Sequence, residues 1–237
     1  MNQKAEPHLD HVDDATLPGA DFARKSLVTA TLVSSGLLAT WAVTSLFAGD
    51  GLAGLDLAAT QWLRAEGSPT DPLGPDWLDG AMRDVTALGS NLILFLVVGV
   101  VLAFLALTGR QGPALLLGWT TVASFLLNNL LKFAIGRARP DFLTPAVIAD
   151  SSSFPSGHAM HTATVFLLIA ALAAREMIDR RLRALVMGTA VALTAAVGLT
   201  RIHLGAHWTS DVLTGWTIGT ALALVGWLLA RSPRPPS

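Results

Sequence analysis

Six stretches of the chain are apolar over the length that a helix needs to cross a bilayer, roughly 17–25 residues. They run over Ser26–Ala48, Asn91–Thr108, Pro113–Phe133, His158–Ala174, Leu182–Thr200 and Val212–Ala230. The composition agrees, since 52% of the residues are apolar, 14% are charged and the mean hydropathy is +0.54. The sequence therefore predicts an all-α integral membrane protein, built as a six-helix bundle.

The two ends of the chain differ from this apolar body. The N-terminus stays polar and acidic to about Asp21, unlike the basic start and short apolar core of a signal peptide. The last residues, 231–237, are rich in Pro and Arg. We therefore expect a polar cytoplasmic segment over 1–25, one membrane domain over 26–230 and a disordered cytoplasmic tail over 231–237.

Basic and acidic residues are divided between the connections. The segment Gly49–Gly89 is strongly acidic, whereas the basic side chains flank the first and last spans or follow the second and fourth: Arg24, Lys25, Arg110, Arg175, Arg180, Arg181, Arg183, Arg231 and Arg234. With an even number of spans, these basic sites all lie on one side, which the positive-inside rule makes cytoplasmic. We expect a multi-pass protein of a bacterial cytoplasmic (inner) membrane, with its acidic loop on the periplasmic face.

The acidic first outer loop contains two short patterns of helical period. Leu55, Ala59, Trp62 and Leu63 form one, and Trp77, Leu78, Ala81, Met82 and Val85 form the other. They predict short amphipathic helices that lie on the outer surface or cap the bundle, as a packed lid or a route for substrate. In the apolar body, Gly215 and Gly219 predict close helix packing, and Asn128 and Asn129 predict hydrogen bonds between helices.

Three polar clusters interrupt the apolar pattern on the predicted outer face. They are Lys132 to Pro140, Pro155-Ser156-Gly157-His158, and Thr200 to Asp211. In the second cluster, Ser156 is a preferred N-cap, and a helix start offers unpaired N–H groups to an anion such as phosphate. Gly157 would let that anion approach the backbone. Basic residues on the face that disfavours them also predict an anionic ligand.

Spacing indicates roles for these residues. If His207 to Asp211 is helical, the two side chains share one face, and Asp211 would accept a hydrogen bond from one imidazole nitrogen. The other nitrogen would then be free as a nucleophile, and His158 would protonate the departing alkoxide. Neutralising the charge of a phosphoryl group would fall to Lys132, Arg139, Arg201, the Ser156 hydroxyl and the Gly157 amide.

A metal site is another reading of the same residues. His203, His207 and Asp211 would align on a continuous helix as metal ligands, with His158 and His161 as further candidates. Gly205 and Trp208-Thr209-Ser210 instead indicate a loop entering a helix, and Arg139 and Arg201 would repel a cation. The chain has no cysteine, and its net charge of −1 gives no reason to expect nucleic acid.

The patterns K-x6-R-P, P-S-G-H and R-x5-H-x3-D occur in this order between Lys132 and Asp211. They resemble the three signature motifs of the type 2 phosphatidic-acid phosphatase family, which belongs to a superfamily with acid phosphatases and vanadium haloperoxidases. The resemblance implies His207 as nucleophile, Asp211 as its partner and His158 as general acid. It also implies phosphate binding by Lys132, Arg139, Ser156, Gly157 and Arg201. Thr200 stands where the family commonly has Ser, and both residues carry a hydroxyl.

The resemblance implies a membrane lipid phosphatase that works through a phosphohistidine, without a metal ion or other cofactor. Its substrate would be phosphatidic acid, phosphatidylglycerol phosphate or a polyprenyl diphosphate, and no obligate protein partner is evident. The alternative from another class is a transporter or flippase that binds an anionic headgroup without cleaving it. The His207/Asp211 pair with His158 favours hydrolysis, because binding alone needs neither a nucleophile nor an acid.

Overall fold

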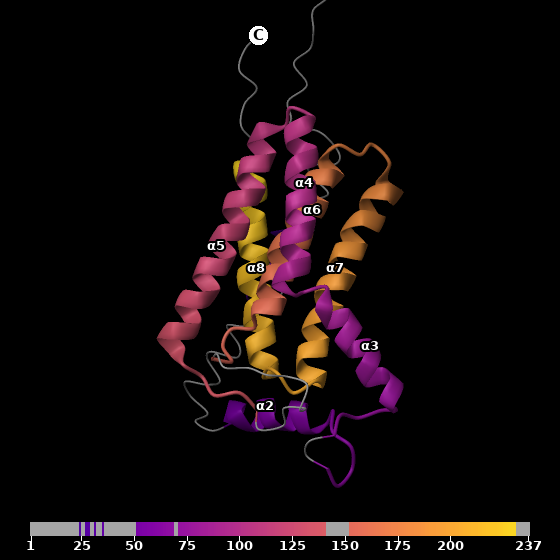
Figure 1. Ribbon diagram of the computed structural model, residues 1–237, viewed down its shortest axis with the longest axis vertical. Helices are drawn as coiled ribbons and strands as arrows, with labels where there is room; N and C mark the ends of the chain where they lie inside the picture. The colour runs from indigo at the N-terminus through magenta and orange to yellow at the C-terminus, as the bar shows by residue number, and fades with distance from the viewer. Residues whose placement is uncertain are drawn as a thin grey trace, which may run out of the picture.

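The computed structural model describes residues 51–68, 71–140 and 152–230, together with Arg24, Leu27, Val28, Thr31 and Ser35. The described part of the chain is all-α (Figure 1). Its helices are α2 (Gly51–Gln61), α3 (Asp76–Ala87), α4 (Asn91–Leu107), α5 (Gln111–Ile135), α6 (Gly157–Arg175), α7 (Arg180–His203) and α8 (Thr209–Leu229). The first predicted span, Ser26–Ala48, lies almost wholly outside the described residues, as does the tail 231–237.

Four of these helices, α5 to α8, are long and apolar enough to cross a membrane. A fifth span results if α3 and α4 are counted as one unit, which bends by 43° between them. Each of the last five predicted spans is thus a helix, and α4, with 17 residues, lies at the short end of the range for a span. Large apolar side chains on α4 and α5, among them Phe104 and Phe133, are exposed as lipid-facing residues would be.

Helix α6 lies in the centre of the bundle, where it packs against α5, α7 and α8. Its contact with α8 depends on two glycines, as predicted. A Cβ atom at Gly215 would lie 2.7 Å from the Ser156 carbonyl oxygen, and one at Gly219 would lie 2.7 Å from the Ala163 Cβ. Because the two backbones approach this closely, the start of α8 is held directly beside the start of α6.

The ends of the bundle have different contents (Figure 1). The α4–α5 and α6–α7 connections lie at one end, with the basic residues Arg110, Arg180 and Arg181. The end of α5, the start of α6 and the α7–α8 connection meet at the other end. All three predicted polar clusters therefore lie at one end of the bundle.

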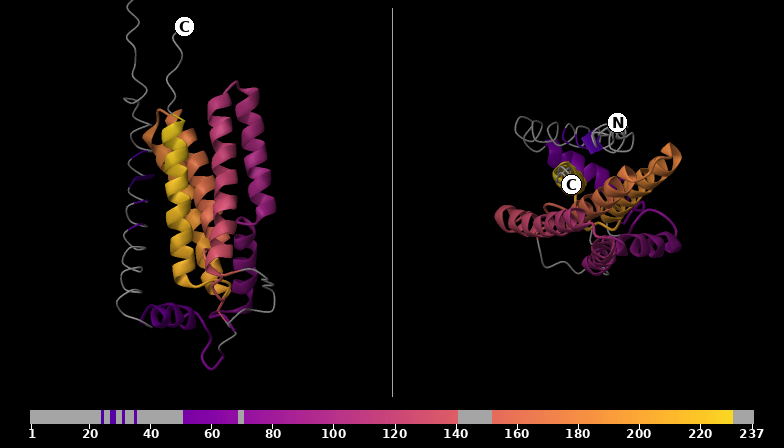
Figure 2. Two further views of the ribbon diagram at one scale, coloured as in Figure 1. Left: turned by 90° about the vertical axis from the view of Figure 1, so that its left-hand side faces the viewer. Right: turned by 90° about the horizontal axis from the view of Figure 1, so that it is seen from above.

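The acidic first loop forms two helices at this same end, as predicted. Helix α3 packs against α7, and α2 lies across the end of the bundle against α8 (Figure 2). Trp62 and Trp77 are 79% and 71% exposed, so neither indole forms part of the packed interior. Instead, α2 turns the buried Asp56 toward the bundle.

Candidate functional site

The site begins where α6 starts. Ser156 is the N-cap of α6, as predicted, and its backbone N–H donates to the Asp211 carbonyl oxygen at 3.1 Å. Its hydroxyl is buried and has no hydrogen-bond partner among the described residues. Gly157 packs closely against α5, since a Cβ there would lie 3.2 Å from the Asn128 Oδ1. The α6 start therefore presents an unused hydroxyl beside α8.

Asn128 and Asn129, near the end of α5, were both expected to bond between helices. Asn128 does so, since its buried amide donates to the Pro155 carbonyl oxygen at 3.4 Å. Asn129 is exposed, so the prediction is wrong for that residue. One residue along a helix turns a side chain by about 100°, which takes Asn129 away from the α6 interface.

A turn at the end of α7 sets the distance between Arg201 and His207. Gly205 has φ +69°, and its N–H and that of Ala206 donate back to the carbonyls of Ile202 and Arg201 at 3.0 Å each. This Schellman arrangement needs the left-handed conformation that glycine adopts without strain. His207 N–H also reaches the Arg201 carbonyl, at 3.2 Å. The spacing of these two motif residues is thus fixed by a helix end.

His207 and Asp211 lie together where a loop enters α8. Helix α8 starts only at Thr209, with Trp208 as its N-cap, so His207 precedes the helix. The condition of a helix over His207 to Asp211 is not met, whereas the alternative reading of a loop entering a helix is confirmed, because Gly205 ends α7 and the chain turns before α8. Contact arises instead because the Asp211 side chain reaches back over the helix start, where its Oδ2 lies 3.6 Å from His207 Nδ1 and 3.0 Å from the Trp208 backbone nitrogen.

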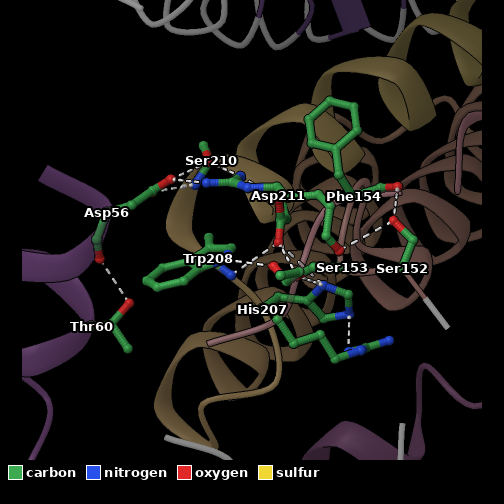
Figure 3. A network of polar contacts seen from close by, with 12 residues as sticks. Asp56, Thr60, Ser152, Ser153, Phe154, His207, Trp208, Ser210 and Asp211 are labelled. Carbon is green, nitrogen blue, oxygen red and sulfur yellow. Dashed lines mark hydrogen bonds and ion pairs between the residues drawn. The ribbon is translucent and has the colours of Figure 1, made fainter. Parts of the chain in front are cut away.

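The Asp211 carboxylate is fully buried and surrounded by donors (Figure 3). Ser153 donates its hydroxyl to Oδ2, and Arg137 Nη1 donates to Oδ1 at 2.6 Å. Both donors come from the segments that flank the undescribed residues 141–151. These bonds hold the carboxylate in one orientation, because each oxygen has its own partner.

The two imidazole nitrogens of His207 have different neighbours. Nδ1 faces the Asp211 carboxylate and, at 3.5 Å, the Ser153 hydroxyl, whereas Nε2 lies 3.4 Å from Arg139 Nη1. A guanidinium can only donate, and an ionised carboxylate can only accept. We therefore assign the proton to Nδ1, which leaves the Nε2 lone pair directed at Arg139. The same Arg139 nitrogen is held by the Ala206 carbonyl at 2.7 Å.

His207 is neutral at physiological pH. Burial lowers its pKa from 6.5 to about 4, and the charges of Arg201 and Arg139 act in the same direction. The hydrogen bond with Asp211 and its negative charge oppose this shift without reversing it. Burial also lowers the pKa of Arg139, which the charge of Asp211 partly offsets. An unprotonated imidazole nitrogen beside a guanidinium is thus the resting state.

The remaining predicted site residues surround this pair. Lys132 donates to the Ser152 carbonyl and lies within electrostatic range of Arg139, Arg201 and Asp211. Arg201 donates to the Thr86 hydroxyl on α3 at 3.1 Å. His158 is partly exposed, and its ring lies within electrostatic range of His207 and Arg201. The structure therefore brings all eight predicted site residues to one end of the bundle.

Sequence reasoning missed three residues of this site. Ser153 bonds to Asp211, Arg137 joins Asp211 to Asp56, and Asp56 comes from α2, 154 residues before Ser210, its partner on α8. Arg137 was visible only as part of a basic cluster. Ser153 lies in a run of three serines, and Asp56 is one of many acidic residues in its loop. No signal in the sequence separated these residues from their neighbours.

Of the histidines that the structure describes, His203 and His161 lie outside the His207 pair. His203 Nε2 is 3.2 Å from Asp79 Oδ1 on α3, and Arg64 donates to the His203 carbonyl at 2.6 Å. His161 Nδ1 is 2.8 Å from the Ser124 hydroxyl, and its ring stacks on Phe125 at 3.8 Å. Within the described ranges, no three His, Asp or Glu side chains converge as metal ligands. The alternative reading of His203, His207 and Asp211 as ligands aligned on one helix does not hold, because α7 ends at His203 and α8 begins at Thr209.

The fold is a bundle of helices long and apolar enough to cross a membrane, and at one end a neutral imidazole beside a carboxylate lies among several cations. This arrangement is typical of a membrane protein that acts on anionic groups at the membrane surface. The model of the PAP2 superfamily matches residues 113–234. This range includes all three motif clusters and helices α5 to α8. The chain belongs to the PAP2 superfamily, and it is a multi-pass membrane phosphatase of lipid phosphates.

Relatives of known activity agree with this assignment. Over 147 residues the chain is 33% identical to phosphatidylglycerophosphatase B of Bacillus subtilis, covering 62% of this chain and 72% of the relative. It is 38% identical over 117 residues to a lipid A 1-phosphatase of Rhizobium etli, covering 46% of this chain and 44% of the relative. A decaprenylphosphoryl-5-phosphoribose phosphatase of Mycobacterium tuberculosis is 30% identical over 146 residues, which is 60% of this chain and 75% of the relative.

Solved structures show the same fold. The crystal structure of a transmembrane PAP2-type phosphatidylglycerolphosphate phosphatase from Bacillus subtilis superposes with a TM-score of 0.69 at 27% identity, covering 86% of this chain and 94% of that chain. The crystal structure of Aquifex aeolicus LpxE superposes with a TM-score of 0.55 at 22% identity, covering 73% of this chain and 94% of that chain, and supports the fold alone.

The state of His207 can be measured directly. Long-range 1H–15N spectra of the histidine-labelled protein in detergent should show the His207 ring protonated on Nδ1 and titrating near pH 4 rather than 6.5. The unfolded chain takes up this proton near 6.5, so the free energy of unfolding should fall as the pH drops from about 6.5 to about 4. A His207→Gln variant identifies the signal. A titration near 6.5, or a proton on Nε2, would contradict the assignment.

Proposed function

We propose that this chain hydrolyses the terminal phosphate of a lipid phosphate or diphosphate through a phosphohistidine on His207, without a metal ion. The observation that carries the proposal is the His207 ring itself. Its Nδ1 side is held by Asp211, and its neutral Nε2 lies 3.4 Å from a guanidinium that can also bind a phosphoryl oxygen. A nucleophile and a charge-stabilising donor therefore lie side by side.

The charges around His207 support an anionic substrate. Among the described residues around His207, the cations Lys132, Arg137, Arg139 and Arg201 outnumber the carboxylates Asp56 and Asp211 by two. A phosphate monoester carries about −1.5 to −2 charge near pH 7 and would balance this excess. Of the cations, Lys132, Arg139 and Arg201 are proposed to bind the phosphoryl oxygens, with the free Ser156 hydroxyl and the Gly157 N–H at the α6 start.

In the proposed reaction, Nε2 of His207 attacks phosphorus, and the bond from phosphorus to the lipid oxygen breaks. His158, in its protonated form, gives the departing alkoxide its proton. Water then attacks the phosphohistidine, and the N–P bond breaks to release phosphate. Since His158 is now neutral, it accepts the proton from that water. Asp211 keeps the His207 ring oriented throughout by accepting from Nδ1.

The membrane arrangement follows from the charges. We propose that residues 26–230 form one six-span phosphatase domain, in which α4 and the segment Ser26–Ala48 each complete a span. The connections with Arg110, Arg180 and Arg181 would then face the cytoplasm together with both termini, and the site would face the periplasm. The exposed Trp62 and Trp77 beside the site suit the headgroup region.

The relatives suggest which substrates to test. Phosphatidylglycerol phosphate comes first, because the Bacillus subtilis relative named for it matches over most of its own length. Phosphatidic acid and polyprenyl diphosphates present the same terminal phosphate on an apolar tail. The site residues described above contact only that phosphate in the proposed reaction, so they predict activity across this group.

A trapping experiment tests the covalent step. Purified protein mixed briefly with 32P-labelled lipids from this group, in EDTA, and quenched in base should carry alkali-stable, acid-labile label. His207→Ala should carry none and lose roughly 10³-fold or more of its turnover, because the bond-forming atom is removed. Reversible loss of turnover in EDTA, restored by metal, would refute the metal-independent mechanism. Label on the His207→Ala protein would refute the assignment of the nucleophile.

A leaving-group series tests His158. His158→Ala should lower kcat/KM on an alkyl lipid phosphate by about 10²–10⁴-fold, because an alkoxide needs a proton to depart. On an acylated aryl phosphate, whose phenol leaves without help, the loss should be much smaller. Equal losses on both substrates would show that His158 binds substrate instead of acting as the acid.

Cysteine labelling tests the orientation, since the chain has no cysteine of its own. Asp71→Cys and Arg181→Cys place single thiols at exposed positions on opposite ends of the bundle. In spheroplasts, a membrane-impermeant maleimide should label Asp71→Cys at once and Arg181→Cys only after lysis. The reverse pattern would overturn the proposed topology.

A further inference from the structure

Asp56 is a buried carboxylate that contacts the site but belongs to none of the three motifs. Asp56 lies on α2, outside the 113–234 range that matches the family model, and is only 5% exposed. It accepts hydrogen bonds from the Ser210 backbone nitrogen at 3.0 Å, the Ser210 hydroxyl at 2.5 Å and Arg137 Nη2 at 2.8 Å. Burying a carboxylate costs free energy unless hydrogen-bond donors replace the water molecules that would solvate it. The donors to Asp56 come from Ser210 and Arg137, which both lie at the site.

Arg137 connects Asp56 to Asp211, the carboxylate beside the proposed nucleophile His207. Its Nη2 bonds to Asp56, while its Nη1 bonds to Asp211 Oδ1 at 2.6 Å and to the Ser210 hydroxyl at 2.7 Å. The guanidinium also lies over the Trp208 ring, 5.6 Å from its centroid. The planar fork of arginine thus joins two carboxylates in a fixed geometry, which a lysine could not reproduce.

These contacts determine which oxygen of Asp211 faces His207. Arg137 occupies Oδ1, so Oδ2 is left for His207 Nδ1, Ser153 and the Trp208 N–H. Figure 3 shows Asp56 reaching Ser210 from one side, with Asp211 and His207 on the other. Without Asp56, Arg137 would lose one of its two anionic partners and be free to pair with Asp211 alone. The Asp211 carboxylate would then move with the Arg137 guanidinium, and its contact with His207 Nδ1 would change.

We propose that Asp56 is a positioning residue for the phosphatase reaction, acting through Arg137 and Ser210 on the Asp211 carboxylate that orients His207. This inference rests on the proposed role of His207 as nucleophile. It extends the catalytic unit to α2, a helix of the first loop, and predicts that losing Asp56 impairs the chemical step more than substrate binding. Small displacements of a reacting group lower rates strongly, because the reaction needs a narrow range of approach geometries.

The test is a double-mutant cycle in detergent with the full chain. Asp56→Asn keeps the shape but removes the charge, and Arg137→Lys keeps the charge but cannot bridge two carboxylates. Each should lower kcat by about 10- to 100-fold while KM changes by less than about twofold. The double variant should be no worse than the worse single one, because both break the same connection. Asp71→Asn makes the same replacement of a carboxylate by a carboxamide at an exposed position of the same loop, and its kcat and KM should match those of the wild type.

Rates are taken per folded molecule, from thermal unfolding and from the amplitude of the phosphoenzyme. If Asp56→Asn fails to fold, Ser210→Ala replaces it, since this variant leaves Asp56 charged but removes a shared donor; it should show the same kcat-specific loss. Wild-type kcat, a loss confined to KM, or multiplying effects of Asp56 and Arg137 would each overturn the inference. Turnover by His207→Ala would overturn the proposed function instead, so the two failures are distinguishable.

Discussion

The structure depends on keeping one carboxylate ionised where water does not reach it. Asp211 is fully buried, and an isolated buried carboxylate would be protonated instead of charged. Its donors come from three separate parts of the chain: Arg137 after α5, Ser153 before α6, and the Trp208 N–H with His207 at the start of α8. Gathering these donors requires the ends of α5, α6 and α8 to meet. The same contacts therefore keep Asp211 ionised and hold this end of the bundle together.

Two glycines of α8 allow these helix ends to come together. Close contact at Gly215 and Gly219 brings the α8 start beside the α6 start, where Ser156 N–H bonds to the Asp211 carbonyl. Lipid offers no hydrophobic force to hold helices together, so packing and hydrogen bonds must do so. The hydrogen-bonded network at the site then also stabilises the packing of these helices, so its loss would lower the stability of the protein as well as the rate of the proposed reaction.

Much of this could be predicted from the sequence, and the failures have a common cause. The apolar segments predicted the last five helices correctly, because the thickness of a bilayer sets the length of a span. The motif residues also lie together. Asp56, Arg137 and Ser153 were missed because their importance arises only between segments; Asp56 and Arg137 are 81 residues apart. The geometry of the His207 and Asp211 contact was likewise open, because spacing alone fits both a helix face and a loop that enters a helix. A spacing of four residues fits a helix face, yet here Gly205 and the N-cap at Trp208 produce the contact by a turn.

The surroundings of Asp211 also bear on how the proposed nucleophile works. A carboxylate that already accepts from Arg137, Ser153 and Trp208 is held in one orientation. Its hydrogen bond and its charge act to raise the pKa of His207, but burial outweighs them and keeps that pKa at about 4. Asp211 therefore contributes orientation and the choice of tautomer more than added basicity. In a two-step reaction this is an advantage, because an imidazole of low basicity is always unprotonated for the attack on phosphorus. It is also a better leaving group when water attacks the phosphohistidine. A strongly basic histidine would favour the first step at the expense of the second.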